Sequence, residues 1–202
     1  LDFHIPGWCA NPALSVNGAA VAVEPNVKGF ARISRCWQPG DTVRLHLPMT
    51  ATVRTGRDAA PAGPFDGAHR PTPVTIPEEN STQGAPYASV SYGPLLFALP
   101  IPDTTDANTP NPSARWQFAL DASEPGLTVE RGAMPSRWDW PLAAPLKLHV
   151  NAVEIDWRPD PKSPRLPPLP AAKTKPAERI ALVPYGCTKF RISMFPVAEP
   201  SR

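Results

Sequence analysis

The stretch YASVSYGPLLFALPIP, residues 87–102, decides how the rest of this chain is interpreted. It carries no charged side chain, and its β-branched, aromatic and leucine side chains favour a well-buried strand. Gly93 and Pro94 interrupt it, because glycine permits a bend and proline lacks the N–H that a sheet ladder needs. We therefore predict a bulge or a strand entry at this pair. The stretch closes a first β-rich half of the chain and leads into a second.

Proline content sets the fold class. Proline accounts for 30 of the 202 residues, which is about threefold its usual share. Each proline inside a helix costs about 3 kcal/mol, so this density excludes long helices but allows strands joined by irregular loops. The net charge is +2 without any cluster of basic residues, so we expect no nucleic-acid partner. No apolar run is long enough to span a membrane, and we expect no membrane partner.

Alternating apolar and polar residues predict several strands. The pattern is clear at residues 1–5, 43–47 and 190–194, and Asn17-Gly18 between two apolar runs predicts a tight hairpin. We also predict a terminal hairpin that joins 180–183 to 190–194. The following side chains are expected to be buried: Leu45, Leu47, Leu96, Phe97, Leu148, Phe190 and Ile192.

A half-buried strand needs a second sheet over its apolar face, which favours β-sandwiches. We predict an all-β protein with two β-sandwich, jelly-roll-like domains and long proline-rich loops. The first domain covers residues 1–102, a linker covers 103–112, and the C-terminal domain covers 113–202. The chain begins directly in a strand-like segment without a signal peptide, which we interpret as a fragment of a longer protein.

Few residues point to chemistry. The three cysteines, Cys9, Cys36 and Cys187, match no zinc spacing, and buried free thiols are the simplest interpretation, with a Cys9–Cys36 bridge as the alternative. We expect no metal and no cofactor. Trp138 and Trp140 lie two apart in an extended segment, where paired indoles can stack on a sugar, and Arg137 can donate to sugar hydroxyls. The alternative is that both indoles only pack against other parts of the protein.

Several motifs in order resemble one family. LDFHIPGWC (1–9) and LSVNG (14–18) come first, followed by ISRCWQPGDTV (33–43), LHLPM (45–49) and YGPLLFAL (92–99). APLKL (144–148) and LVPYGCTKFRI (182–192) follow. Together they resemble glycoside hydrolase family 127 (GH127), the β-L-arabinofuranosidase-like proteins.

The resemblance implies that this chain is the C-terminal β-sandwich region of such a protein, with the N-terminal strands of the first sandwich missing. Family members place their cysteine nucleophile and zinc ligands in an (α/α)6 barrel, and no position here matches those motifs. We therefore expect no catalytic residue and no activity from this chain alone. Its expected partners are the barrel of the same parent protein and plant oligosaccharide, and the parent is expected to be secreted or periplasmic. A free-standing carbohydrate-binding module is the alternative.

Overall fold

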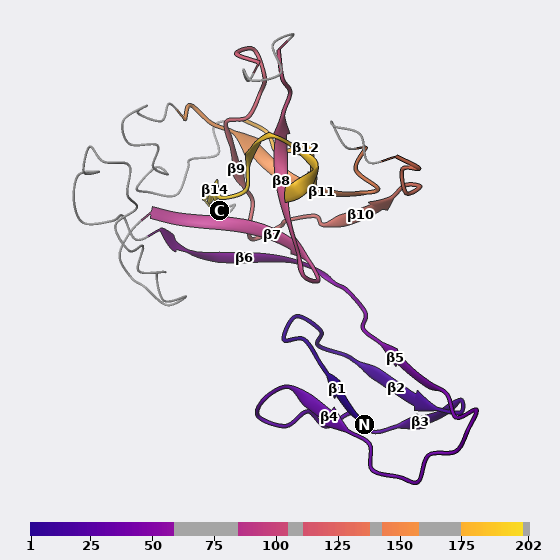
Figure 1. The fold of residues 1–202 in the computed structure, drawn as a ribbon. Coiled ribbons are helices and arrows are strands. Elements are labelled where there is room, and N and C mark those ends of the chain that lie inside the picture. Colours follow the sequence, from indigo (N-terminus) through magenta and orange to yellow (C-terminus); the bar gives the residue numbers. More distant parts are fainter. Residues whose placement is uncertain (59–84, 105–110, 138–142, 158–174, 200–202) are drawn as a thin grey trace, which may run out of the picture. The chain divides into compact units, whose positions relative to one another are not determined.

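The computed structural model describes residues 1–58, 85–104, 111–137, 143–157 and 175–199. Within these residues the chain forms fourteen strands and a single short 3-10 helix, so the predicted all-β class is confirmed. The described chain divides into two compact units (Figure 1). Unit 1 comprises residues 1–50 and 92–94, and unit 2 comprises residues 51–91 and 95–202.

Unit 1 contains five strands of three or four residues each: β1 (Asp2–His4), β2 (Ala13–Val16), β3 (Ala19–Val21), β4 (Phe30–Arg32) and β5 (Val43–His46). β1 pairs with β4, and β2 lies between β3 and β5, all antiparallel. The predicted hairpin joins β2 to β3. Asn17 and Gly18 have φ angles of 52° and 82°, which the two central residues of a type I′ turn require and which asparagine and glycine tolerate best.

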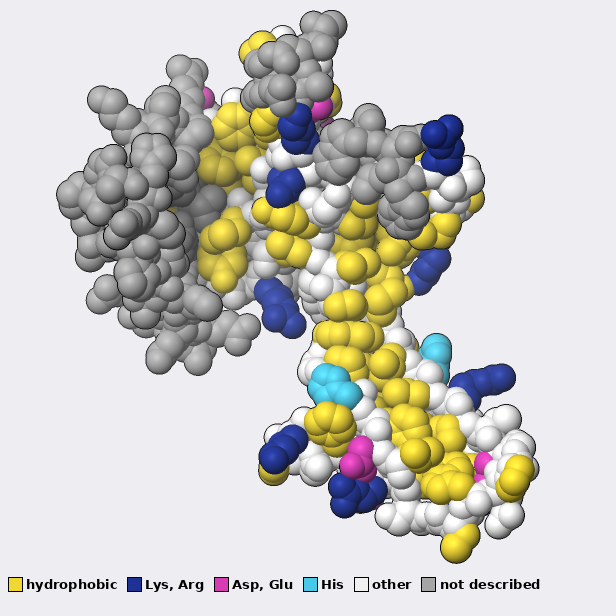
Figure 2. Space-filling view, viewed as in Figure 1, with side chains coloured by type: hydrophobic (Ala, Val, Ile, Leu, Met, Phe, Trp, Pro, Cys, Tyr) yellow, Lys and Arg dark blue, Asp and Glu magenta, His cyan; other side chains and the backbone are white. Residues whose placement is uncertain are grey.

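The apolar core of unit 1 is small. Leu14, Val16 and Ile33 are buried together, and six partly buried side chains pack against them: Phe3, Val21, Val23, Trp37, Val43 and Leu45. Figure 2 shows hydrophobic side chains at the surface over this three-stranded sheet. Leu45 and Leu47, expected to be buried, are therefore only half-buried.

Unit 2 contains one sheet of nine strands. These are β6 (Ala51–Asp58), β7 (Ala85–Tyr92), β8 (Leu95–Ile101), β9 (Phe118–Leu120), β10 (Thr128–Arg131), β11 (Leu146–Glu154), β12 (Glu178–Pro184), β13 (Phe190–Ile192) and β14 (Phe195–Pro196). The main order is β10-β11-β12-β8-β7-β14, with β6 on β7, β13 on β8 and β9 on β11. The 3-10 helix η1 (Tyr185–Cys187) follows β12.

The stretch at residues 87–102 forms two strands. β7 and β8 are hydrogen-bonded neighbours, and Gly93-Pro94 is the turn between them rather than a bulge, with Gly93 at a φ of 55°. Phe97 is fully buried as predicted, and Leu148 is too. Leu96 is 40% exposed, so its predicted burial is wrong, because it lies just after the turn where described residues leave it uncovered. Phe190 and Ile192 are half-buried.

The predicted terminal hairpin does not form in the described chain. β12 and β13 each pair with β8 instead of with each other. β7 and β8 also share their sheet with β10 to β14, which lie beyond the expected linker at 103–112. The compact units divide near residue 50, and the domain bounds expected from the sequence, 1–102 and 113–202, remain a prediction.

Candidate functional site

Of the three residues predicted to bind sugar, the structure describes Arg137 alone. Arg137 is exposed and follows β10, and Trp138 and Trp140 lie outside the described residues. The structure therefore does not test whether these three side chains come together. Sugar binding by them remains a prediction.

The described residues offer little to bind a metal ion. These residues hold no cluster of three or more His, Cys, Asp or Glu side chains placed to bind a metal ion. All three cysteines are free, as predicted, but only Cys9 is buried: Cys36 is exposed, so its expected burial is wrong, and Cys187 is half-buried. Burial raises the pKa of the Cys187 thiol, which disfavours the reactive thiolate. No described helix has the length and apolar character needed to cross a membrane.

A cavity of about 480 Å³ lies within unit 2. Its walls come from four segments: the end of β8 with the residues after it, the start of β11 with the residues before it, the end of β12, and η1 with its exit. The lining residues are Pro100, Ile101, Pro102, Asp103, Ala144, Lys147, Val183, Cys187, Thr188 and Lys189. Its size falls within the range of small-molecule sites, and its walls are mostly apolar with a few polar groups, which is typical of such sites.

Hydrogen bonds from Arg191 hold one wall of the cavity. The Arg191 side chain on β13 donates from Nη1 to the carbonyl oxygens of Thr188 at 2.5 Å and Lys189 at 3.0 Å. Its guanidinium lies 3.7 Å from the ring centroid of Tyr185 in η1, a cation–π contact. The Thr188 hydroxyl, itself buried, donates to the Phe190 carbonyl at 3.0 Å. The segment 185–189 is therefore fixed in part by Arg191, which does not itself line the cavity.

One of the lysines that line the cavity is paired with a carboxylate outside the lining. Glu130 on β10 lies directly opposite Lys147 on β11, and its carboxylate contacts Lys147 Nζ at 3.2 Å and His149 Nε2 at 2.8 Å. Hydrogen bonds from His149 and Lys147 hold the pKa of Glu130 below its usual range. Glu130 thus remains ionised near neutral pH and orients a lysine that lines the cavity.

Sequence reasoning missed this cavity. Its lining residues come from segments separated by tens of residues, and no motif links them, so only the pairing of β8 with β12 and β13 brings them together. The single available signal was the pair Asp103 and Lys189 beside apolar strand ends, which is too common to indicate a site.

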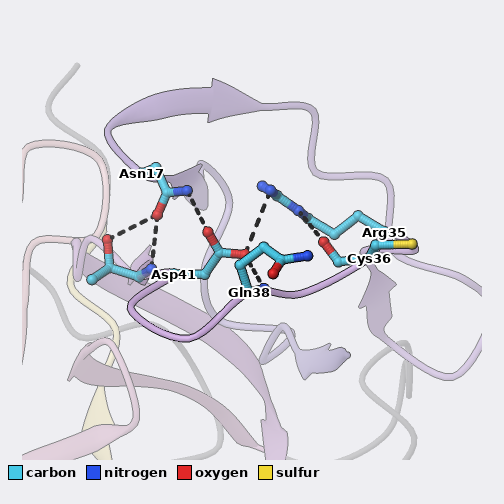
Figure 3. A network of polar contacts seen from close by, with 6 residues as sticks. Asn17, Arg35, Cys36, Gln38 and Asp41 are labelled. Atoms are coloured by element: carbon cyan, nitrogen blue, oxygen red, sulfur yellow. Dashed lines mark hydrogen bonds and ion pairs between the residues drawn. The ribbon is translucent and has the colours of Figure 1, made fainter.

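Unit 1 contains a polar network built from the motif residues (Figure 3). Asp41 accepts hydrogen bonds from Asn17 Nδ2 at 2.7 Å and from the backbone N–H of Gln38 at 2.9 Å. Arg35 Nη2 lies 3.5 Å from Asp41 Oδ2. The hydrogen bond from Asn17, followed by that from Gln38, lowers the pKa of Asp41. The side-chain Oδ1 of Asn17 also accepts a hydrogen bond from the backbone N–H of Thr42 at 2.8 Å. The network ties the β2–β3 turn to the loop before β5, which is a structural role.

Comparison with known families shows where these motifs belong. Residues 1–49 match the family model "Beta-L-arabinofuranosidase, GH127 middle domain". Residues 1–49, about a quarter of this chain, are therefore similar to the GH127 middle domain. The resemblance drawn from the sequence motifs is confirmed, and the network of Asn17, Arg35 and Asp41 lies entirely within the matched residues.

Solved structures show a similar fold over nearly the whole chain. One is titled a glycoside hydrolase, with a TM-score of 0.57 at 20% identity, covering 98% of this chain and 27% of that protein. Another is a GH127 β-L-arabinofuranosidase from Geobacillus stearothermophilus, with a TM-score of 0.52 at 21% identity, covering 99% and 26%. A third, a GH127 β-arabinofuranosidase, has a TM-score of 0.50 at 16% identity, covering 93% and 23%. The search of curated protein sequences gave no match.

The solved proteins are much longer than this chain. This chain spans about a quarter of the length of the solved proteins that it resembles. At these identities the likeness establishes the fold alone, and the similarity to the GH127 middle domain is limited to residues 1–49. The activity named in the titles belongs to those longer proteins.

Proposed function

We propose that this chain is a non-catalytic β region of a GH127 β-L-arabinofuranosidase-like hydrolase, in which it supports an (α/α)6 catalytic barrel. The observation that carries the proposal is the GH127 middle-domain match over residues 1–49, together with solved relatives about four times as long. The described residues also lack a cluster suited to metal binding. The small, half-exposed core of unit 1 favours a role in contact with more protein.

The test combines this chain with a separately produced GH127 barrel from the same reading frame. We expect the chain alone to give no turnover of an aryl β-L-arabinofuranoside, and the two parts together to co-elute in gel filtration and to raise the melting temperature of the barrel. Turnover by the pure chain, abolished by replacing Cys9, Cys36 or Cys187, would show that the chain is itself catalytic. Separate elution with unchanged melting temperatures would contradict the supporting role.

A second candidate function is direct contact with plant glycan, including action as a free-standing carbohydrate-binding module. It is favoured by the cavity in unit 2 and, separately, by the sequence pattern of Trp138 and Trp140 with Arg137. Stacked indoles contribute on the order of 1 kcal/mol each beyond area burial, which predicts millimolar affinity. Titration with arabino-oligosaccharides should quench tryptophan fluorescence, and the double variant W138A/W140A should abolish the change. A flat titration would leave packing as the role of both indoles.

A further inference from the structure

The hairpin turn of unit 1 contains an asparagine side chain in a chemically reactive setting. Asn17 is the only asparagine in the sequence that is followed by glycine. In such a pair the backbone nitrogen of the glycine can attack the side-chain Cγ of the asparagine, because glycine has no Cβ to hinder the approach. Asn17 and Gly18 are both exposed, and a Cβ added at Gly18 would meet no atom of the described residues within 4 Å beyond its chain neighbours. The pair is therefore open to solvent.

The reaction that this pair allows is deamidation through a cyclic imide. A bond forms between Gly18 N and Asn17 Cγ, the Cγ–Nδ2 bond breaks, and the side-chain nitrogen leaves as ammonia with the proton of the Gly18 N–H. Water then opens the ring at either of its carbonyl carbons. The product at position 17 is aspartate or isoaspartate.

Hydrogen bonds hold the Asn17 side chain in its unreacted arrangement (Figure 3). Its Nδ2 donates to Asp41 Oδ1 at 2.7 Å, and its Oδ1 accepts from the backbone N–H of Thr42 at 2.8 Å. The backbone N–H of Asn17 also donates to the Thr42 carbonyl at 2.9 Å. Ring closure turns the amide plane and makes Cγ tetrahedral, so it breaks or distorts both side-chain hydrogen bonds. The reactive conformation is therefore populated when the turn opens locally.

Deamidation reverses the character of the contact with Asp41. The product carries a carboxylate where Asn17 has its NH2 donor, and it faces the Asp41 carboxylate, whose side chain is only 11% exposed. Two carboxylates at this distance repel each other, and limited access of water leaves the repulsion poorly screened. Arg35 Nη2, 3.5 Å from Asp41 Oδ2, offsets only part of the added charge. Isoaspartate also adds a backbone atom to a two-residue turn, whose geometry has no place for it.

We propose that Asn17-Gly18 is a modification site, at which deamidation is an irreversible switch that Asp41 and Thr42 restrain in the folded chain. Once the turn opens and the amide is converted, the contact that would close the turn again is lost. The loop at 38–42 is then released from the β2–β3 turn. The site lies within the residues similar to the GH127 middle domain, and the proposal does not depend on the supporting role.

The first experiment measures the restraint. Conversion at position 17 is followed by peptide-resolved mass spectrometry during storage of the 202-residue chain at mildly alkaline pH, beside a synthetic peptide of residues 12–22. The folded chain should convert at least about tenfold more slowly than the peptide, because more than one hydrogen bond must open. Equal rates in the chain and the peptide would overturn the proposal.

A substitution with a matched control assigns the restraint to Asp41. Asp41→Ala removes the acceptor of Asn17 Nδ2 and should accelerate conversion about twofold to tenfold, the factor by which loss of one hydrogen bond raises the open population. Asp2→Ala is the control, because Asp2 is also a hydrogen-bonded carboxylate of unit 1 but its partner is Arg32. Conversion in this control should keep the rate of the unmodified chain. Equal rates in the two variants would overturn the assignment.

Exchange of the two groups tests the switch itself. Asn17→Asp places the product carboxylate opposite Asp41 and should speed hydrogen exchange at 38–42 by about tenfold. The double variant N17D/D41N lets the amide at position 41 donate to the carboxylate at position 17, while the backbone N–H groups of Gln38 and Thr42 keep their acceptors. Its exchange should return to within about twofold of the unmodified chain. No acceleration in the single variant, or no recovery in the double variant, would overturn the switch.

Circular dichroism shows whether each variant is folded, and the double variant keeps the test valid if Asp41→Ala is not. None of these measurements needs a barrel. Their outcome is therefore separable from the co-elution that tests the supporting role.

Discussion

The two units of this chain differ in how they are held together. Unit 2 buries large side chains completely, among them Phe97, Phe195, Leu120, Leu148 and Leu182. Unit 1 has short strands and smaller buried side chains, with Leu14, Val16 and Ile33 in one cluster, and it depends in addition on the polar network around Asp41. The GH127 match nevertheless lies within residues 1–49. Several of the motif residues in unit 1 therefore form turns and polar contacts rather than a large apolar core.

The largest expected effect is in unit 2. Phe97→Ala should lower the free energy of unfolding by about 3–5 kcal/mol, because Phe97 has no exposed surface and its removal leaves a cavity. Leu96→Ala is the matched control on the same strand and should cost less than about 1 kcal/mol, since Leu96 is 40% exposed. Urea unfolding followed by fluorescence measures both. Similar losses would show that β8 is not buried on one side as described.

A smaller effect is expected in unit 1. Asn17→Ala should cost about 1–2 kcal/mol, because alanine tolerates the positive φ poorly and lacks the amide that contacts Asp41 and Thr42. Asn17→Gly keeps the turn and removes only the amide, so it should cost less. Hydrogen exchange resolved by peptide should show faster exchange in residues 1–50 alone. Equal acceleration in unit 2 would mean that the two units unfold as one.

Thiol labelling compares the opening of the units directly. Cys36 is exposed and should react first with an aromatic disulfide reagent under native conditions. Cys9 is buried in unit 1 and Cys187 is half-buried in unit 2 with a raised pKa, so both should react more slowly. If unit 1 opens locally, low urea should accelerate Cys9 several-fold more than Cys187. Parallel acceleration of the two would contradict the difference in stability.

The smallest effect is expected from acid, and it should affect both units alike. Asp41 in unit 1 and Glu130 and Glu154 in unit 2 have pKa values lowered in the folded state by their hydrogen-bonded partners. Their contribution to stability is therefore present above the pKa of the unfolded carboxyls, near about 4, and is lost as pH falls through the lower folded values. Urea midpoints should fall modestly below about pH 4. Glu154→Gln should flatten that dependence, and a midpoint unchanged with pH would contradict it.

Local chemistry was predictable from the sequence, and distant pairing was not. Asn17-Gly18 predicts its hairpin because the turn geometry depends on those two residues themselves. The burial of Phe97 follows from its apolar context, but the exposure of Leu96 depends on what covers the start of β8. The prediction of a terminal hairpin was wrong because β12 and β13 each pair with β8. Their closeness in sequence does not reveal that a more distant strand pairs with both.

The candidate site shows the same limit more strongly. The motif residues Asn17, Arg35 and Asp41 could be named from the sequence, but their role as a structural network needed the hydrogen bonds. The cavity between β8, β11, β12 and η1 had no local signature at all, since its walls meet only after the sheet forms. The role of a side chain can be predicted from the sequence when its partners lie nearby in the chain. The residues that line the cavity come from distant segments, so their role could not be predicted in this way.

The pairing of β14 with β7 has a consequence for synthesis on the ribosome. Phe195 is fully buried and sits opposite Ala88, so unit 2 cannot complete its sheet until a segment far downstream has left the ribosome. Unit 1 draws nearly all of its residues from the first 50 and can form while translation continues. During that interval β7 and β8 are available without their later partners, so nascent chains stopped before residue 195 should need a chaperone to remain unaggregated.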